Sequence, residues 1–144
     1  MKHYNLRSDI GIFALMLILS LSAGCKSDSP TEPTERNISG TYNQRSIDGN
    51  SLPWTLLDTG SQKFVILSGV LKLNSNKAFE KLITIEETNR IFIPTTVETT
   101  TETLSGVYSL EDSQITFTED SDGSISTGNI TGNTITWGTG VYVK

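Results

Sequence analysis

The chain has 144 residues, of which 35% are hydrophobic and 19% are charged, and its formal net charge at pH 7 is −5. This length fits one modest domain and not two. Its single histidine is His3, its single cysteine is Cys25, and both methionines precede Cys25. If the segment before Cys25 is removed, the rest of the chain lacks the residues for a Ser-His-Asp triad, a Cys-His nucleophile, a histidine or multi-cysteine zinc site, or a haem held by His or Met. We therefore expect no catalytic residues of these kinds, no metal site and no cofactor.

Residues 1–24 have the pattern of a secretory signal peptide. Lys2 and Arg7 give a positive start, and residues 10–21 (IGIFALMLILSL) carry no charge. This apolar stretch is too short to span a hydrocarbon core of ~30 Å, which takes about 20 residues. It suits the central region of a signal peptide.

The next residues, Leu21-Ser22-Ala23-Gly24-Cys25, resemble the lipobox of bacterial lipoproteins. The resemblance implies cleavage between Gly24 and Cys25, and lipidation of the Cys25 sulfur with fatty acyl chains such as palmitate. Several acyl chains make membrane attachment effectively permanent. Ser22 departs from the lipobox, in which leucine is commonest three residues before the cysteine. The alternatives are an ordinary signal peptide cut after Gly24 and an uncleaved anchor.

Residues 25–37 form the lipidated N-terminus and a flexible tether in this interpretation. The segment 26–37 (KSDSPTEPTERN) holds two prolines, several charges and no apolar residue. Such a segment buries too little surface to offset its ordering entropy. Lys26 differs from the aspartate of the inner-membrane retention signal of enteric bacteria. By analogy with those bacteria, the absence of this aspartate favours a lipid anchor in the cell envelope at the outer membrane over the inner membrane.

Residues 38–144 are long enough to bury roughly two-thirds of their unfolded surface and to fold alone. The chain holds 20 threonines and 14 isoleucines, and their branched Cβ atoms favour strands. Apolar side chains occupy both faces along residues 64–73, which predicts a strand buried on both faces, and they alternate along residues 83–85, 104–110, 115–117 and 135–137. Turn residues separate these segments at 48–50, 58–60, 74–76, 88–89, 111–113, 120–123 and 132–133. Short strands joined by short turns predict an all-β fold, an antiparallel up-and-down barrel of about 8–9 strands.

Gly40-Thr41-Tyr42 resembles the Gly-x-Trp opening of lipocalins, with tyrosine in place of tryptophan. Together with residues 47–53 (IDGNSLP), 106–110 (GVYSL) and 132–137 (GNTITW), it makes the domain similar to lipocalin-like lipoproteins of environmental bacteria. The resemblance implies a lipocalin-like barrel. The interior of such a barrel is filled by side chains or holds one small ligand. The candidates for the barrel interior or the ligand lining are Tyr42, Trp54, Phe64, Phe79, Tyr108, Phe117 and Trp137.

The carboxylates do not predict an enzyme. Glu86 and Glu87 are adjacent on a strand, so they point to opposite faces. Glu98 and Glu102 share a face but lie ~13 Å apart at ~3.3 Å per residue. Glycosidase carboxyl groups lie about 5–9.5 Å apart. A pair drawn from two different strands stays open.

Two further segments have simple structural interpretations. Residues 118–123 (TEDSDG) resemble part of a calcium loop, but they lack its first acidic residue and its twelfth-position glutamate, so a hairpin turn with Gly123 at positive φ is predicted. Alternate residues of the run 95–103 (TTVETTTET) share one strand face, which we expect to be solvated.

Charge and fold together leave two functions open. The nine basic and fifteen acidic residues after position 24 give a net charge of −6, which argues against binding to nucleic acid. The first function is a binding module that holds a small apolar ligand in the barrel mouth. The second is a non-catalytic structural or protein-interaction module of the cell envelope. A cavity of at least ~300 Å³ favours the binding module.

Overall fold

The computed structural model describes residues 36–144. The predicted signal peptide, the predicted lipidation site at Cys25 and the tether as far as residue 35 therefore lie outside the described residues. Residues 37–144 form one compact unit. The described part of the chain contains no helix that is long and apolar enough to cross a membrane.

Residues 36–144 form ten strands and no helix. The strands are β1 (Gly40–Ile47), β2 (Asn50–Ser51), β3 (Trp54–Asp58), β4 (Gln62–Leu73), β5 (Ala78–Asn89), β6 (Thr96–Glu111), β7 (Gln114–Glu119), β8 (Ile125–Thr131), β9 (Thr134–Trp137) and β10 (Gly140–Val143). Every pairing between them is antiparallel.

Eight of these strands form a closed ring in the order β1, β10, β9, β8, β7, β6, β5, β4. Strand β1 closes the ring because it pairs with both β4 and β10. Its first half pairs with β4, starting with Gly40 opposite Leu73. Its second half pairs with β10, starting with Asn43 opposite Val143. The prediction of an all-β, antiparallel up-and-down barrel is confirmed.

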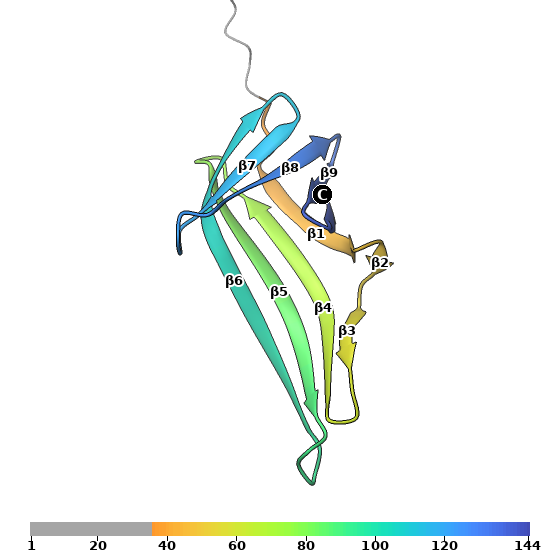
Figure 1. The fold of residues 1–144 in the computed structure, drawn as a ribbon. Coiled ribbons are helices and arrows are strands. Elements are labelled where there is room, and N and C mark those ends of the chain that lie inside the picture. The colour runs from red at the N-terminus through yellow and green to blue at the C-terminus, as the bar shows by residue number, and fades with distance from the viewer. Residues whose placement is uncertain (1–35) are drawn as a thin grey trace, which may run out of the picture. The chain divides into compact units, whose positions relative to one another are not determined.

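The strands differ strongly in length. β4 and β5 have 12 residues each and β6 has 16, whereas β9 and β10 have four each. The long strands therefore continue past one end of the barrel, with β3 paired beside β4 (Figure 1). We call this part the extension: β3 with residues 62–66, 84–89 and 96–103. The threonine-rich run on β6 is exposed there, as predicted.

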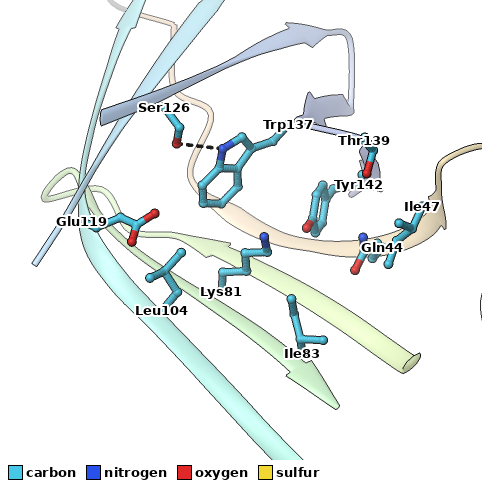
Figure 2. Close-up of a pocket in the computed structure, with 12 residues that line it drawn as sticks. Gln44, Ile47, Lys81, Ile83, Leu104, Glu119, Ser126, Trp137, Thr139 and Tyr142 are labelled. Carbon is cyan, nitrogen blue, oxygen red and sulfur yellow. Dashed lines mark hydrogen bonds between the residues drawn. The ribbon is translucent and has the colours of Figure 1, made fainter. Parts of the chain in front are cut away.

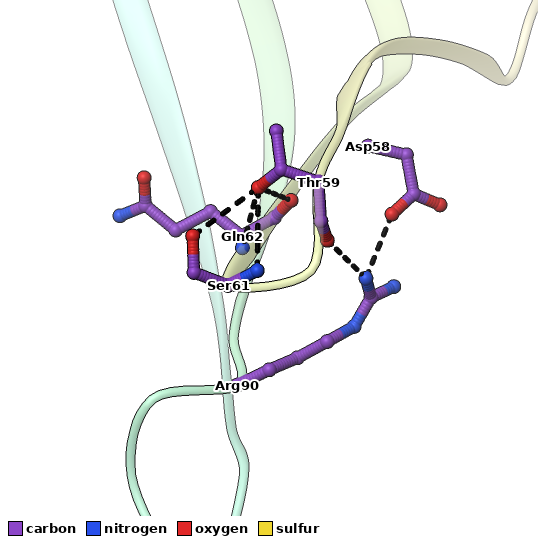
Figure 3. Close-up of polar contacts among 5 residues, drawn as sticks. All are labelled: Asp58, Thr59, Ser61, Gln62 and Arg90. Carbon is purple, nitrogen blue, oxygen red and sulfur yellow. Dashed lines mark hydrogen bonds and ion pairs between the residues drawn. The ribbon is translucent and has the colours of Figure 1, made fainter.

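An arginine links the far ends of the extension (Figure 3). Arg90 follows β5, and its Nη1 donates to Asp58 Oδ1 at 2.7 Å and to the Thr59 carbonyl at 2.6 Å. The guanidinium lowers the pKa of the Asp58 carboxyl through this hydrogen bond. In the same turn, Thr59 Oγ1 accepts a hydrogen bond from the backbone N–H of Gln62 at 3.0 Å. These contacts connect the β3–β4 turn to the segment after β5.

The core lies inside the ring. Its buried side chains are Ile38, Tyr42, Leu71, Leu73, Phe79, Tyr108, Ile115, Phe117, Ile130, Ile135, Trp137 and Tyr142. The Phe117 and Trp137 rings are stacked, with centroids 3.9 Å apart and an interplanar angle of 15°. Phe79 meets Phe117 edge-on at 5.1 Å and Trp137 edge-on at 5.6 Å. Such aromatic contacts stabilise a core beyond the area they bury.

Tyr42 is the tyrosine of the Gly40-Thr41-Tyr42 sequence at the start of β1. It is 2% exposed, and its hydroxyl donates to the Ile38 carbonyl at 2.7 Å. The Lys144 ammonium lies 5.7 Å from the centroid of the Tyr42 ring and donates to the Ser39 carbonyl at 2.6 Å. Segments from the start and the end of the domain therefore meet over Tyr42.

One predicted turn is wrong and another is confirmed. Thr88 and Asn89 were expected in a turn, but β5 continues through Asn89, which pairs with Thr96. The pairing with β6 overrides the local turn preference of Asn89, so the connection consists of residues 90–95. Gly123 has a φ of 71°, as predicted for its hairpin turn. The Asp122 carboxylate accepts from the Ser124 amide at 2.8 Å in that turn.

We expect Phe117→Ala to lower the free energy of unfolding by about 3–5 kcal/mol, because it removes a buried ring and leaves a cavity. Ile125→Ala is the control: Ile125 is 70% exposed, so its truncation should change stability by less than about 0.5 kcal/mol. Urea denaturation measures both. Equal effects of the two substitutions would contradict the assigned core.

Candidate functional site

An open cavity of about 380 Å³ is lined mainly by residues of the ring strands. Its lining residues are Gln44, Ile47, Lys81, Ile83, Leu104, Glu119, Ser126, Trp137, Gly138, Thr139, Gly140 and Tyr142 (Figure 2). Every ring strand except β4 contributes to this set. A smaller hollow of about 230 Å³ shares Lys81, Ile83 and Leu104 with it. The cavity therefore continues toward β5 and β6, the two paired strands that lead into the extension.

Trp137 connects the cavity to the core. One face of its ring stacks on Phe117, and its Nε1 donates to Ser126 Oγ at 2.9 Å. The Lys81 ammonium lies 4.5 Å from the centroid of the Trp137 ring. The indole thus has a fixed orientation and contributes both an apolar surface and a cation–π partner.

Lys81 is a cation between apolar residues on one face of β5. It alternates along β5 with Phe79 and Ile83, so all three point to the barrel interior. Its neighbours across the sheet are Leu71 and Leu104. Burial lowers the pKa of the Lys81 ammonium, and the Glu119 carboxylate partly opposes this effect. Among the described residues, no oxygen accepts a hydrogen bond from this ammonium and no carboxylate forms an ion pair with it.

Gln44 is the buried polar residue of the barrel wall, with 8% of its surface exposed. Its Oε1 is buried and has no hydrogen-bond partner among the described residues. A buried acceptor without a donor costs free energy unless a ligand or water supplies the donor. Gly69 on β4 leaves space for this amide, because a Cβ at position 69 would collide with Gln44 Oε1.

Figure 2 shows how these polar groups are arranged. Lys81 lies in the middle of the lining residues, with Glu119 on one side and Gln44 and Tyr142 on the other. Glu119 is the last residue of β7, so its carboxylate lies at an end of the barrel wall. The cavity therefore combines one half-buried ammonium and one carboxylate with apolar walls.

The structure distributes the predicted aromatic residues over two regions. Tyr42, Phe79, Tyr108 and Phe117 are packed in the core, and Trp137 both joins the core and lines the cavity. The other two are half-buried in the extended sheet: Trp54 is opposite Ile66, and Phe64 is opposite Leu57.

Two glutamates from different strands lie opposite each other, a pairing that the spacing of residues in the sequence could not predict. Glu87 on β5 pairs with Glu98 on β6, and both line a hollow of about 100 Å³ with Phe92. The side-chain Nε2 of Gln62 lies 3.5 Å from Glu87 Oε1. Within residues 36–144, no group of three or more His, Cys, Asp or Glu side chains could hold a metal ion.

Comparisons of the chain with protein-family models, curated proteins and solved structures found no match. The resemblances to lipoproteins and lipocalins therefore rest on the short motifs of the sequence, with the observed barrel in agreement with the second.

Sequence reasoning did not identify Lys81 or Gln44 as site residues. The signal was present, because Lys81 interrupts the apolar alternation of Phe79 and Ile83, and Gln44 shares a strand face with Tyr42. A polar residue on an inward face is a candidate for function. Only the closed ring shows that both residues line one cavity.

Burial raises the pKa of Tyr142 to about 12. The unfolded chain, with a tyrosine pKa of ~10, loses this proton first, so the free energy of unfolding should fall as the pH rises from about 10 to 12. We expect Tyr142→Phe to reduce this fall. Urea denaturation across that pH range measures it. An identical decline in the wild type and the variant would show that the Tyr142 phenol is not responsible.

Proposed function

We propose that the protein is a non-enzymatic lipoprotein of the cell envelope whose barrel binds a small, largely apolar molecule in the cavity. The observation that carries this proposal is the cavity volume of about 380 Å³, which falls within the range of ~300–1,000 Å³ typical of ligand sites. Its walls include Ile47, Ile83, Leu104 and the Trp137 ring. A few polar groups among apolar walls are the usual composition of such a site.

The membrane part of the proposal rests on the sequence. The lipobox-like segment ending in Cys25 favours a lipid anchor, and Lys26 favours the outer membrane. Residues 26–37, which carry two prolines and no apolar residue, suit a tether between that anchor and the barrel.

A second candidate function is a structural or protein-interaction module. Large apolar side chains at the far end of the extension favour it: Ile91 is 67% exposed, Phe92 is 60% exposed and Ile93 is fully exposed. Exposed apolar groups that cluster often mark interaction sites. These residues are separate from the cavity lining, so the two functions can be tested independently.

For the binding function, we expect protein purified from its own host to carry a bound small molecule, visible as added mass in native mass spectrometry. Ile83→Trp should abolish the added mass, because the indole fills the cavity. Val107→Trp is the matched control, since Val107 is 53% exposed and lies between two inward-facing positions of β6. The proposal fails if the wild type carries no added mass, or if Ile83→Trp retains it.

For the anchor, we expect Cys25→Ala to move the protein from the membrane fraction to the soluble fraction, because lipid attachment requires the thiol. Lys26→Ala, one residue further on, should leave the protein in the membrane fraction. Fractionation followed by immunoblotting measures both. Membrane association that survives Cys25→Ala would rule out lipidation as the anchor.

A further inference from the structure

The extension is a sheet with two open edges, formed by β3 and β6 (Figure 1). Strand β3 has features that keep an edge from pairing with other chains: it has five residues, it follows Pro53, and its register shifts between Thr55 and Leu57. Strand β6 lacks these features. Residues 96–104 pair with β5 in regular register and contain no proline. No strand pairs with their other side, because pairing with β7 begins only at Gly106.

The unpaired main-chain groups of β6 belong to alternate residues. The Tyr108 N–H donates to the carbonyl of Lys77, the residue before β5, at 2.7 Å. The Ser105 carbonyl instead accepts from the Asp120 N–H, on the β7 side, at 2.9 Å. Main-chain groups alternate in direction along a regular antiparallel strand, so the odd-numbered residues turn their N–H and C=O groups away from β5. We call the exposed residues of this kind the β6 edge: Val97, Thr99, Thr101 and Thr103.

The intervening side chains give the β6 edge a negative charge. Glu98 and Glu102 lie on the same face of β6 as Leu104, which lines the cavity, and Glu87 lies opposite Glu98. Among the ion pairs of residues 36–144, none involves these three carboxylates. A strand added to β6 would therefore meet carboxylates on one face of the sheet and threonine side chains on the other.

These charges argue against a second copy of the chain as the added strand. If two β6 edges paired antiparallel along their full length, Val97 would lie opposite Thr103. Glu98 of each copy would then lie directly opposite Glu102 of the other. Like charges in directly opposite positions destabilise a sheet, whereas opposite charges stabilise it. The β6 edge is therefore better suited to a strand that carries lysine or arginine at these positions.

Resting on the second candidate function, a protein-interaction module, and not on the cavity, we propose that the β6 edge binds an extended basic segment of another protein. The segment adds to the sheet as an antiparallel strand. Its main chain pairs with the β6 edge, and its lysine or arginine residues lie beside Glu98 and Glu102. Its alternate residues are small or β-branched and lie beside the threonines on the other face.

The peptide acetyl-TKVKTKTKT-amide is a suitable probe, because it alternates lysine with β-branched residues. Directly opposite residues share a face, so its threonine and valine N–H groups turn toward β6 and its lysine N–H groups turn away. N-methylation removes an N–H and keeps every side chain. We expect methylation at positions 3, 5 and 7 to weaken binding to the wild-type protein at least about tenfold. Methylation at lysine positions 4 and 6 should change it less than about threefold. Fluorescence anisotropy measures both.

Hydrogen exchange and two matched variants test the location. The bound peptide should slow amide exchange at the β6 edge and leave Glu98, Thr100 and Glu102, whose N–H groups face β5, nearly unchanged. Thr99→Pro removes one outward N–H and keeps the β5 pairing, since an edge strand tolerates proline there. It should weaken binding at least about fivefold. Thr99→Val keeps the N–H and should bind as the wild type does. Circular dichroism checks that both variants fold.

The outcomes separate this inference from the proposed functions. Equal binding of the three peptides would overturn it, because charge alone would then explain the attraction. Protection at the exposed loop of residues 91–93 in place of the β6 edge would also overturn it and leave an interaction module with another surface. Self-association of the wild type that protects the β6 edge would make a second copy the partner, against the inference. If the unmethylated peptide does not bind, the inference is wrong, and the cavity proposal keeps its own test by added mass.

Discussion

Strand β1 holds the barrel closed because it pairs with both β4 and β10. Its first residues pair with the end of β4 and its last residues with β10, so strands from the start, middle and end of the domain depend on it. Without β1 the sheet would have open edges along β4 and β10, which favour association with other chains. It would also lose the wall that carries Tyr42 and Gln44. Core and cavity therefore depend on the same closure.

The position of the cavity follows from the unequal strand lengths. One edge of β4 pairs with β1 over residues 70–73 and with β3 over residues 63–66, because β1 leaves β4 to follow β10. The ring ends there, and the extension continues on one side only. A row of apolar residues crosses its strands, with Trp54 opposite Ile66 and Ile66 opposite Ile85. Ile85 lies on the same face of β5 as Ile83, which lines the cavity. An apolar surface thus continues from the barrel into the extension.

The sequence predicted the barrel because β-branched residues, alternation and short turns are local signals. It placed the expected turn too early at Thr88 and Asn89, since the long pairing of β5 with β6 is a tertiary effect. The site was less predictable. Trp137 was recognised as an aromatic interior residue, but Lys81 and Gln44 lie on strands far apart in the chain. Their convergence depends on ring closure between residues 40 and 73, which no local pattern encodes.

Lys81 and Gln44 are the places where the barrel departs from what folding alone would select. Phe117, Trp137 and Phe79 form a well-packed cluster directly beside the cavity, so the interior accommodates large apolar groups. Apolar residues at positions 44 and 81 would avoid both a half-buried ammonium and a buried acceptor without a donor. Departures from local consistency in an otherwise consistent fold are expected at functional sites. Lys81 lines the cavity beside Ile83 and Leu104, so its ammonium is a polar group that a molecule in the cavity would meet.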